Sequence, residues 1–202
     1  MNATSAQSSA QVQAVVDKLN TKDLVAGDII TTRSETPISA IVRVGTFGRV
    51  SHAILYTGGK MGMQYAVDAI GKGVKRDHLH VKLQNVSYAM VFRHKTATTE
   101  QCAKACQWAE LQAQLHKPYD YKSAVRVGKP AKYTRMGRLI IMLDDLEAAQ
   151  DPEGEDASFM CAELVFRAWE IAGAPLIDKP AHLLAPTMLF KTRRLAMLGR
   201  LV

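Results

Sequence analysis

The first half of the chain contains short strand-like segments separated by glycine, and this pattern predicts an antiparallel β-sheet. Residues 51–57 and 64–69 flank a turn that contains glycine and methionine, so we expect them to pair as a hairpin. Three further strands are expected, one within 24–32 and the others at 74–81 and 88–94. Helical periodicity follows, which favours an α+β fold with a central antiparallel sheet packed against helices.

Two helices are predicted after the strands. The first covers residues 98–116, where Thr98 and Gln101 have the spacing of a capping box. The second begins at Cys161 and continues to about Gly173. A cysteine in the first turn of a helix lies where backbone N–H groups point outward and the helix dipole favours the thiolate. The sequence therefore predicts a reactive thiol, which needs a base and a group that orients the base.

His52 is the expected base for Cys161, because it opens a predicted strand that can hold the imidazole rigidly. Gln64 and Asp68 share one face of the neighbouring strand, and either could orient the ring. Asp68 is favoured, because a carboxylate among apolar residues must be paired and would stabilise an imidazolium. Structural roles stay open for both residues: a half-buried imidazole at His52, and a carboxylate that caps the turn at Gly71.

Composition limits the classes of partner. The 202 residues suit one domain, and a hydrophobic fraction of 48% with 22% charged residues is typical of a globular protein. The net charge of +7 favours an anionic partner or surface, whereas only 6% aromatic residues and no recognisable motif argue against nucleic acid. Three cysteines argue against a disulfide framework. The N-terminus lacks the features of a Sec signal, so we expect synthesis in the cytoplasm.

No metal ion or cofactor is expected. Cys102 and Cys106 lie four residues apart on one helix face, but without further ligands they are better explained as small buried hydrophobic side chains. His78 and His80 could suggest a metal site. A solvated basic strand edge that includes Lys82 explains this pair better.

Five motifs occur in a fixed order: Gly27-Asp28-Ile29-Ile30, Ser51-His52-Ala53-Ile54-Leu55-Tyr56, Val67-Asp68-Ala69, Lys117-Pro118-Tyr119-Asp120-Tyr121 and Met160-Cys161-Ala162-Glu163-Leu164-Val165. Together they resemble the circularly permuted NlpC-type, papain-like cysteine hydrolases of the YiiX/YaeF group. The resemblance spans roughly residues 24–189 and implies a papain-like fold, with Cys161 as nucleophile and His52 as base. The resemblance supports Asp68 as the third site residue less directly. The third residue of the family usually follows the His more closely, and if the long turn at 58–63 is left out of the spacing, the matching position is Gln64.

Composition and helical spacing predict that residues 1–20 form a flexible tail and a short N-terminal helix. The resemblance implies that residues 21–202 form a single permuted papain-like catalytic domain with an insert or lid at 126–157. Residues 189–202 are basic and apolar. They are expected either to contact an anionic membrane or a partner, or to form a C-terminal helix docked on the core.

The implied activity is a cysteine peptidase or amidase with a Cys-His-Asp triad and a thioester acyl-enzyme, acting on bacterial cell-wall peptidoglycan peptides. Without a Sec signal, such an antibacterial effector, toxin or lysis enzyme would leave the cell by a specialised secretion system or by lysis. An inhibitor or immunity protein would then be a partner. Two alternatives stay open: a lipid-directed acyl hydrolase or acyltransferase of the lecithin–retinol acyltransferase type, and a non-catalytic binding module.

Overall fold

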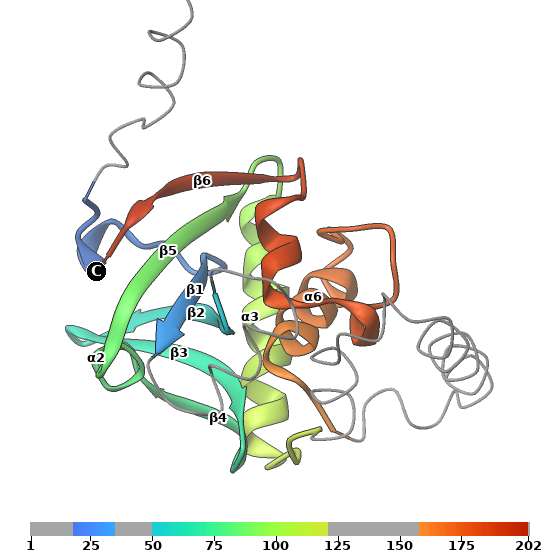
Figure 1. Ribbon diagram of the computed structural model, residues 1–202, viewed down its shortest axis with the longest axis horizontal. Coiled ribbons are helices and arrows are strands. Elements are labelled where there is room, and N and C mark those ends of the chain that lie inside the picture. Colours follow the sequence, from blue (N-terminus) through green and yellow to red (C-terminus); the bar gives the residue numbers. More distant parts are fainter. Residues whose placement is uncertain (1–17, 35–49, 121–157, 202) are drawn as a thin grey trace, which may run out of the picture.

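The computed structural model describes residues 18–34, 50–120 and 158–201, which contain a six-stranded antiparallel sheet with the order β4-β3-β2-β1-β5-β6 (Figure 1). The strands are β1 (Ile29–Ser34), β2 (His52–Lys60), β3 (Met63–Ile70), β4 (Gly73–His78), β5 (Val86–His94) and β6 (Leu195–Arg200). The helices are α2 (Leu79–Lys82), α3 (Thr99–Gln114) and α6 (Cys161–Ile171), with 3-10 helices η1 (Thr21–Asp23), η3 (Ala181–Leu183) and η4 (Pro186–Phe190). The predictions for 11–19 and 34–50 lie largely outside the described residues, and the 126–157 insert lies wholly outside them.

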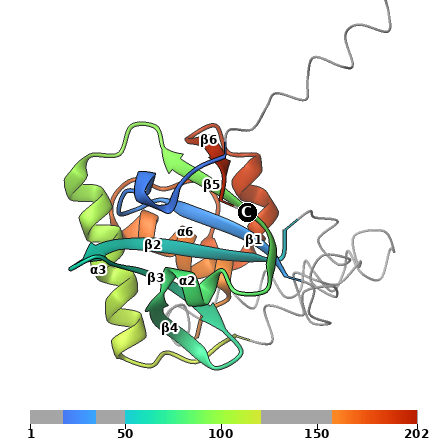
Figure 2. The ribbon, with the colours of Figure 1, turned by 90° about the vertical axis from the view of Figure 1, so that its left-hand side faces the viewer.

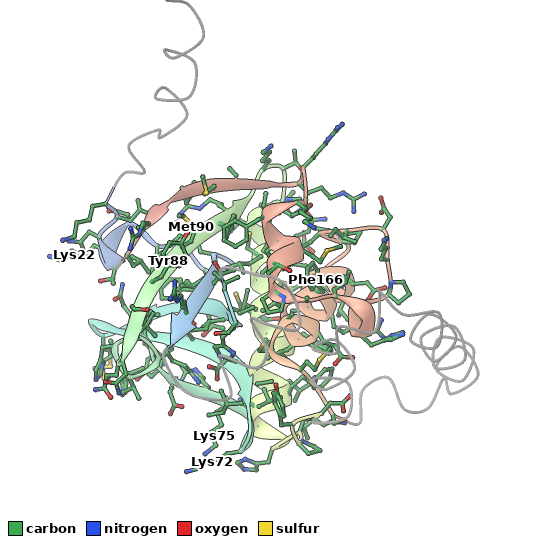
Figure 3. The ribbon with its side chains drawn as sticks, in the orientation of Figure 1. Lys22, Lys72, Lys75, Tyr88, Met90 and Phe166 are labelled. Carbon is green, nitrogen blue, oxygen red and sulfur yellow. The ribbon has the colours of Figure 1, made fainter. Side chains whose placement is uncertain are left out.

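Side chains alternate between the two faces of the sheet, as the two-residue period of a strand requires. Helices α3 and α6 cover one face and enclose the larger core, to which Met90 of β5 and Phe166 of α6 belong (Figure 3). The other face carries a smaller apolar cluster, completed by Leu24 from the chain that enters β1 and by Leu79 of α2. Figure 2 views the sheet from this side, with α2 in front of the sheet and α6 behind it. Asp68 lies two residues after Ala66, which belongs to this second cluster, so both side chains are on the same face of the sheet. Asp68 therefore points towards the side on which α2 lies.

The predicted β2–β3 hairpin is confirmed, and both of its strands are longer than expected. The chain turns at Met61 and Gly62, whose φ angles of 54° and 78° are both positive. Two positive φ angles in a two-residue loop are the pattern of a type I′ turn, which matches the twist of the paired strands. Leu55 lies opposite Val67, and this register fixes where the residues at the start of β2 meet the end of β3.

Both predicted helices are also confirmed. The capping box at α3 is complete, because the Gln101 N–H donates to Thr98 Oγ1 at 3.2 Å and the Thr98 N–H donates to Gln101 Oε1 at 3.0 Å. Helix α6 begins at Cys161, and its buried side packs against α3 and β2. Across the described segments, no helix is both long enough and apolar enough to cross a bilayer.

The motif Gly27-Asp28-Ile29-Ile30 has a structural role at the entry to β1. Gly27 has a φ of +97°, and a Cβ added to it would lie 3.2 Å from side-chain atoms of Cys102 and of Trp169. Asp28 is buried and accepts hydrogen bonds from Arg93 Nε and Nη2, each at 2.7 Å. The motif thus anchors the first strand to both helices and to β5.

Two sequence-based expectations are wrong. The strand expected at 74–81 ends at His78, because the following residues turn into α2, which places Leu79 in the second cluster. The alternative of a C-terminal helix fails because residues 195–200 form β6 instead. This strand pairs with the outer edge of β5, whose backbone groups would otherwise lack strand partners there.

Candidate active site

Cys161 is the first residue of α6 and is buried. The preceding residue, Met160, has an extended backbone, and its N–H donates to Glu163 Oε2 at 3.1 Å. This bond fixes the point at which the helix begins. The thiol therefore lies in the first helical turn, where N–H groups have no intrahelical acceptor and the dipole favours an anion.

His52 is the first residue of β2 and contacts both other predicted site residues. Its Nε2 lies 2.7 Å from Asp68 Oδ2, and its side chain is 22% exposed. The side chain of Cys161 also acts on the imidazole and raises its pKa. Because Nε2 faces the carboxylate, Nδ1 is the ring nitrogen left for the thiol. One imidazole thus bridges β3 and α6.

Opposing effects set the pKa of His52. Burial acts to lower this pKa, but the charge of Cys161 and hydrogen bonds to Asp68 and Cys161 act to raise it. Together the stabilising contacts outweigh burial and raise the pKa of His52 from 6.5 to about 10. The surroundings therefore favour a protonated imidazole at neutral pH, flanked by two groups that can carry negative charge.

Asp68 lies in β3 and is only 3% exposed. Burial acts to raise the pKa of its carboxyl group, whereas the hydrogen bond and charge of His52 and the charge and hydrogen bond of Lys82 lower it. The net effect holds the pKa of Asp68 below its usual 3.8. The buried carboxylate is therefore ionised and has a cation at each of its two oxygens.

Gln64, the alternative orienting residue, lies elsewhere. It is four residues before Asp68 on the same strand, which corresponds to about 13 Å along the strand axis. Its Nε2 donates to the backbone oxygen of Thr21 at 2.5 Å. The structure therefore brings Asp68 to His52, and it does not bring Gln64 there.

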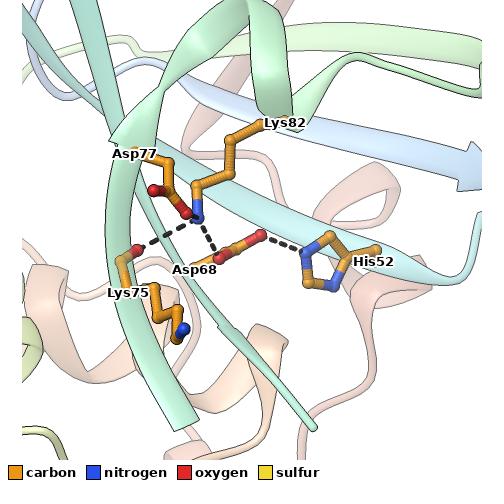
Figure 4. A network of polar contacts seen from close by, with 5 residues as sticks. All are labelled: His52, Asp68, Lys75, Asp77 and Lys82. Atoms are coloured by element: carbon orange, nitrogen blue, oxygen red, sulfur yellow. Dashed lines mark hydrogen bonds and ion pairs between the residues drawn. The ribbon is translucent and has the colours of Figure 1, made fainter. Parts of the chain in front are cut away.

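Lys82 is a member of the site that the sequence analysis missed. It was expected on a solvated edge, yet its side chain is only 4% exposed. Figure 4 shows it extended towards Asp68. Its ammonium donates to Asp68 Oδ1 at 2.5 Å, to Asp77 Oδ2 at 3.3 Å and to the backbone oxygen of Lys75 at 3.1 Å. One indication of such a partner was present in the sequence: the Asp68 carboxylate lies in an apolar strand, so both of its oxygens need partners, and His52 supplies only one.

The remaining candidate residues lie in other surroundings. Burial raises the pKa of Cys106 to about 12 and also raises the pKa of Cys102, so both thiols are protonated at neutral pH. His78 stacks between Tyr65 and His80, with ring centroids 4.8 Å and 5.5 Å away. Within the described part of the chain, no group of three or more His, Cys, Asp or Glu side chains is placed to hold a metal ion.

Asp68→Asn is expected to destabilise the fold by about 3 kcal/mol near neutral pH, because it leaves the Lys82 ammonium buried without its main counter-charge. The pKa of Asp68 is lowered in the folded state. Its ionised form therefore stabilises the fold above the unfolded pKa, and this contribution is lost as the pH falls through the lower folded pKa. Urea unfolding from about pH 7 down to about pH 2 should show the difference between wild type and variant shrinking.

Asp77→Asn is the matched control for that experiment, because Asp77 also contacts Lys82 but its side chain is 46% exposed. It should change the free energy of unfolding by less than about 1 kcal/mol. If the difference between wild type and Asp68→Asn stayed constant over the whole pH range, the carboxylate would not be ionised in the folded protein.

Comparison with known proteins adds a fold relationship. No family model matches the chain, and no curated protein matches its sequence. The crystal structure of the metalloprotein YiiX from Escherichia coli O157:H7 matches with a TM-score of 0.60 and 18% identity, over 87% of this chain and 96% of that one. The described residues here do not supply a donor cluster for a metal ion. The chain thus has a YiiX-like α+β fold, with a six-stranded antiparallel sheet.

Proposed function

We propose that this protein is a cysteine hydrolase in which Cys161 is the nucleophile, His52 the acid and base, and Asp68 the residue that orients His52. The observation that carries the proposal is the continuous contact from Cys161 through the imidazole to Asp68. These are the three roles that activated-thiol catalysis requires: a nucleophile, a base within hydrogen-bond reach, and a group that orients the base.

In the proposed reaction, the Cys161 thiolate attacks the substrate carbonyl carbon and forms a tetrahedral intermediate. The negative oxygen is stabilised by the N–H of Cys161 at the start of α6. The His52 imidazolium then gives its proton to the leaving amine or alcohol, and a thioester forms. In the second half, neutral His52 takes a proton from water, the resulting hydroxide attacks the thioester, and the acid product leaves with the thiolate regenerated.

Bacterial cell-wall peptides are the proposed substrate class. The net charge of +7 suits an anionic wall, and the YiiX-like fold agrees with the hydrolase group that the motifs resemble. The chemistry also suits the substrate, because the thiolate cleaves amide bonds of the kind found in peptide cross-links. Under this proposal, the products are shortened stem peptides that carry a new carboxyl group.

The test is incubation of the purified protein with peptidoglycan sacculi, followed by mass spectrometry of the released muropeptides. Peptide-bond cleavage by the wild type and not by Cys161→Ala would support the proposal. Sacculi that stay intact at high enzyme concentration would count against this substrate.

A lipid-directed acyl hydrolase is the second candidate, favoured by the exposed tip of the β2–β3 hairpin. Met61 is 88% exposed and Met63 45% exposed, beside the exposed Lys60. An apolar tip next to a cation suits the surface of an anionic bilayer. Liposomes containing anionic phospholipid separate the two candidates, because release of fatty acid together with intact sacculi would favour the lipid substrate.

A further inference from the structure

A lysine buried behind an ionised carboxylate is costly, because an ammonium loses its hydration on burial. Lys82 nevertheless has three acceptors around its ammonium, and the principal one is the residue that contacts His52. Helix α2 places it there: β4 ends, Leu79 packs into the second cluster, and the chain turns back so that Lys82 reaches β3 (Figure 4). Stability alone does not require this arrangement, since a well-packed apolar side chain often serves as well.

We propose that Lys82 is a positioning residue whose ammonium keeps Asp68 ionised and turned towards His52, and so sets the pH range in which the imidazole is protonated. This inference rests on the proposed function of His52 and Asp68. Lys82 touches neither substrate nor the reacting atoms, and it acts through the carboxylate.

The geometry of the carboxylate is the first support. Asp68 Oδ1 accepts from Lys82 at 2.5 Å, and Asp68 Oδ2 lies 2.7 Å from His52 Nε2. With one oxygen fixed by the ammonium, rotation of the carboxylate is restricted and the other oxygen stays aimed at the ring. The imidazole is then held with Nδ1 available to the thiol of Cys161.

The distribution of charge is the second support. Among the residues that the structure describes, His52 on β2 and Lys82 on α2 contact Asp68, Asp77 on β4 contacts Lys82, and Lys75 on β4 lies opposite Asp68 in the sheet. Only two of these cations contact the carboxylate, His52 and Lys82. The ammonium and the imidazolium therefore share one carboxylate, and the ammonium opposes protonation of the ring through its like charge.

Lys82→Met is the direct test, because it keeps the length of the side chain and removes the charge. Lys75→Met is the matched control: Lys75 lies opposite Asp68 in the sheet, but it is exposed, and only its backbone oxygen joins the network (Figure 4). NMR titration of His52 in a Cys161→Ala background measures the imidazole without the neighbouring thiolate. We expect Lys82→Met to raise the pKa of His52 by about one pH unit, and Lys75→Met to change it by less than about 0.3.

Enzyme kinetics provide a second readout in the protein that retains Cys161. Lys82→Met should lower kcat/KM about tenfold, because the Asp68 carboxylate is then less firmly held against His52 and its pKa rises. The pH optimum should move upwards, because loss of the nearby ammonium raises the pKa of His52. A purely structural role would lower activity equally at every pH. Equal, small shifts of the His52 titration in Lys82→Met and Lys75→Met would overturn the inference.

Asp77→Asn keeps the test decisive if Lys82→Met does not fold. The Asp77 side chain is 46% exposed and contacts Lys82, so its neutralisation leaves the ammonium less compensated. We expect the pKa of His52 to fall slightly in this variant, opposite in sign to Lys82→Met, and a rise or no change would count against the inference. The NMR result is independent of hydrolysis, so inactivity of the wild type on sacculi and liposomes would refute only the proposed function.

Discussion

Cys161→Ala is expected to lower kcat/KM by at least about 10⁴-fold, because no other group in the site can form the thioester. The fold should survive, since the substitution removes one sulfur atom at a helix start whose capping bond joins Met160 and Glu163. Steady-state hydrolysis of the substrate identified with sacculi or liposomes measures the loss. Thermal unfolding followed by circular dichroism confirms that the variant is folded.

Cys102→Ala and Cys106→Ala are the matched controls, because each removes the same atom from α3. Both thiols have raised pKa values, so neither should supply a thiolate at neutral pH. Each control should retain activity within about twofold of wild type. Iodoacetamide at mildly acidic pH should label Cys161 ahead of the other two. Loss of activity in Cys106→Ala with retention in Cys161→Ala would show that the nucleophile has been assigned to the wrong helix.

Local sequence patterns were sufficient to predict the helices and the hairpin that carry the site residues. The capping box at Thr98 and the helix that begins at Cys161 depend on residues within one or two turns, and both are present as predicted. The hairpin follows from two β-rich segments and a short glycine-containing turn. In strands, the side-chain period of two placed Asp68 and Gln64 on one face, but it could not say which of them meets His52.

The choice between those two residues needed the register of the hairpin and the contacts of each side chain. Gln64 lies near the turn and bonds to Thr21, a residue far away in sequence. Asp68 lies towards the opposite end of β3, where the start of β2 brings His52 close. A count along the chain cannot supply this information, because the lengths of both strands and the bulge near Tyr56 determine the outcome.

Lys82 was missed because its position depends on where a strand stops. A strand continued to residue 81 would have left Lys82 on an open edge, whereas α2 turns it back over β3. Leu79 drives this turn, since its side chain fills the second apolar cluster. In the same way, β6 depends on the edge of β5 that it pairs with, a tertiary feature that residues 195–200 do not reveal by themselves.

His52→Ala is expected to lower kcat/KM by about 10³- to 10⁴-fold, because it removes both the group that activates the thiol and the acid that protonates the leaving group. Stability should change less than in Asp68→Asn, because Asp68 keeps its contact with Lys82. The double variant with Cys161→Ala should be no less active than the worse single variant, since the two residues act as one unit. Added imidazole should restore part of the lost rate in His52→Ala by occupying the vacated space.

His80→Ala is the control for this experiment, because His80 is exposed and stacks on His78, not on His52. It should retain full activity, and added imidazole should not change its rate. The alkylation of Cys161 gives a readout that needs no substrate: His52→Ala should slow it at mildly acidic pH, and His80→Ala should not. If Cys161 in His52→Ala reacted as fast as in the wild type, the helix start alone would activate the thiol, and His52 would be limited to protonating the leaving group.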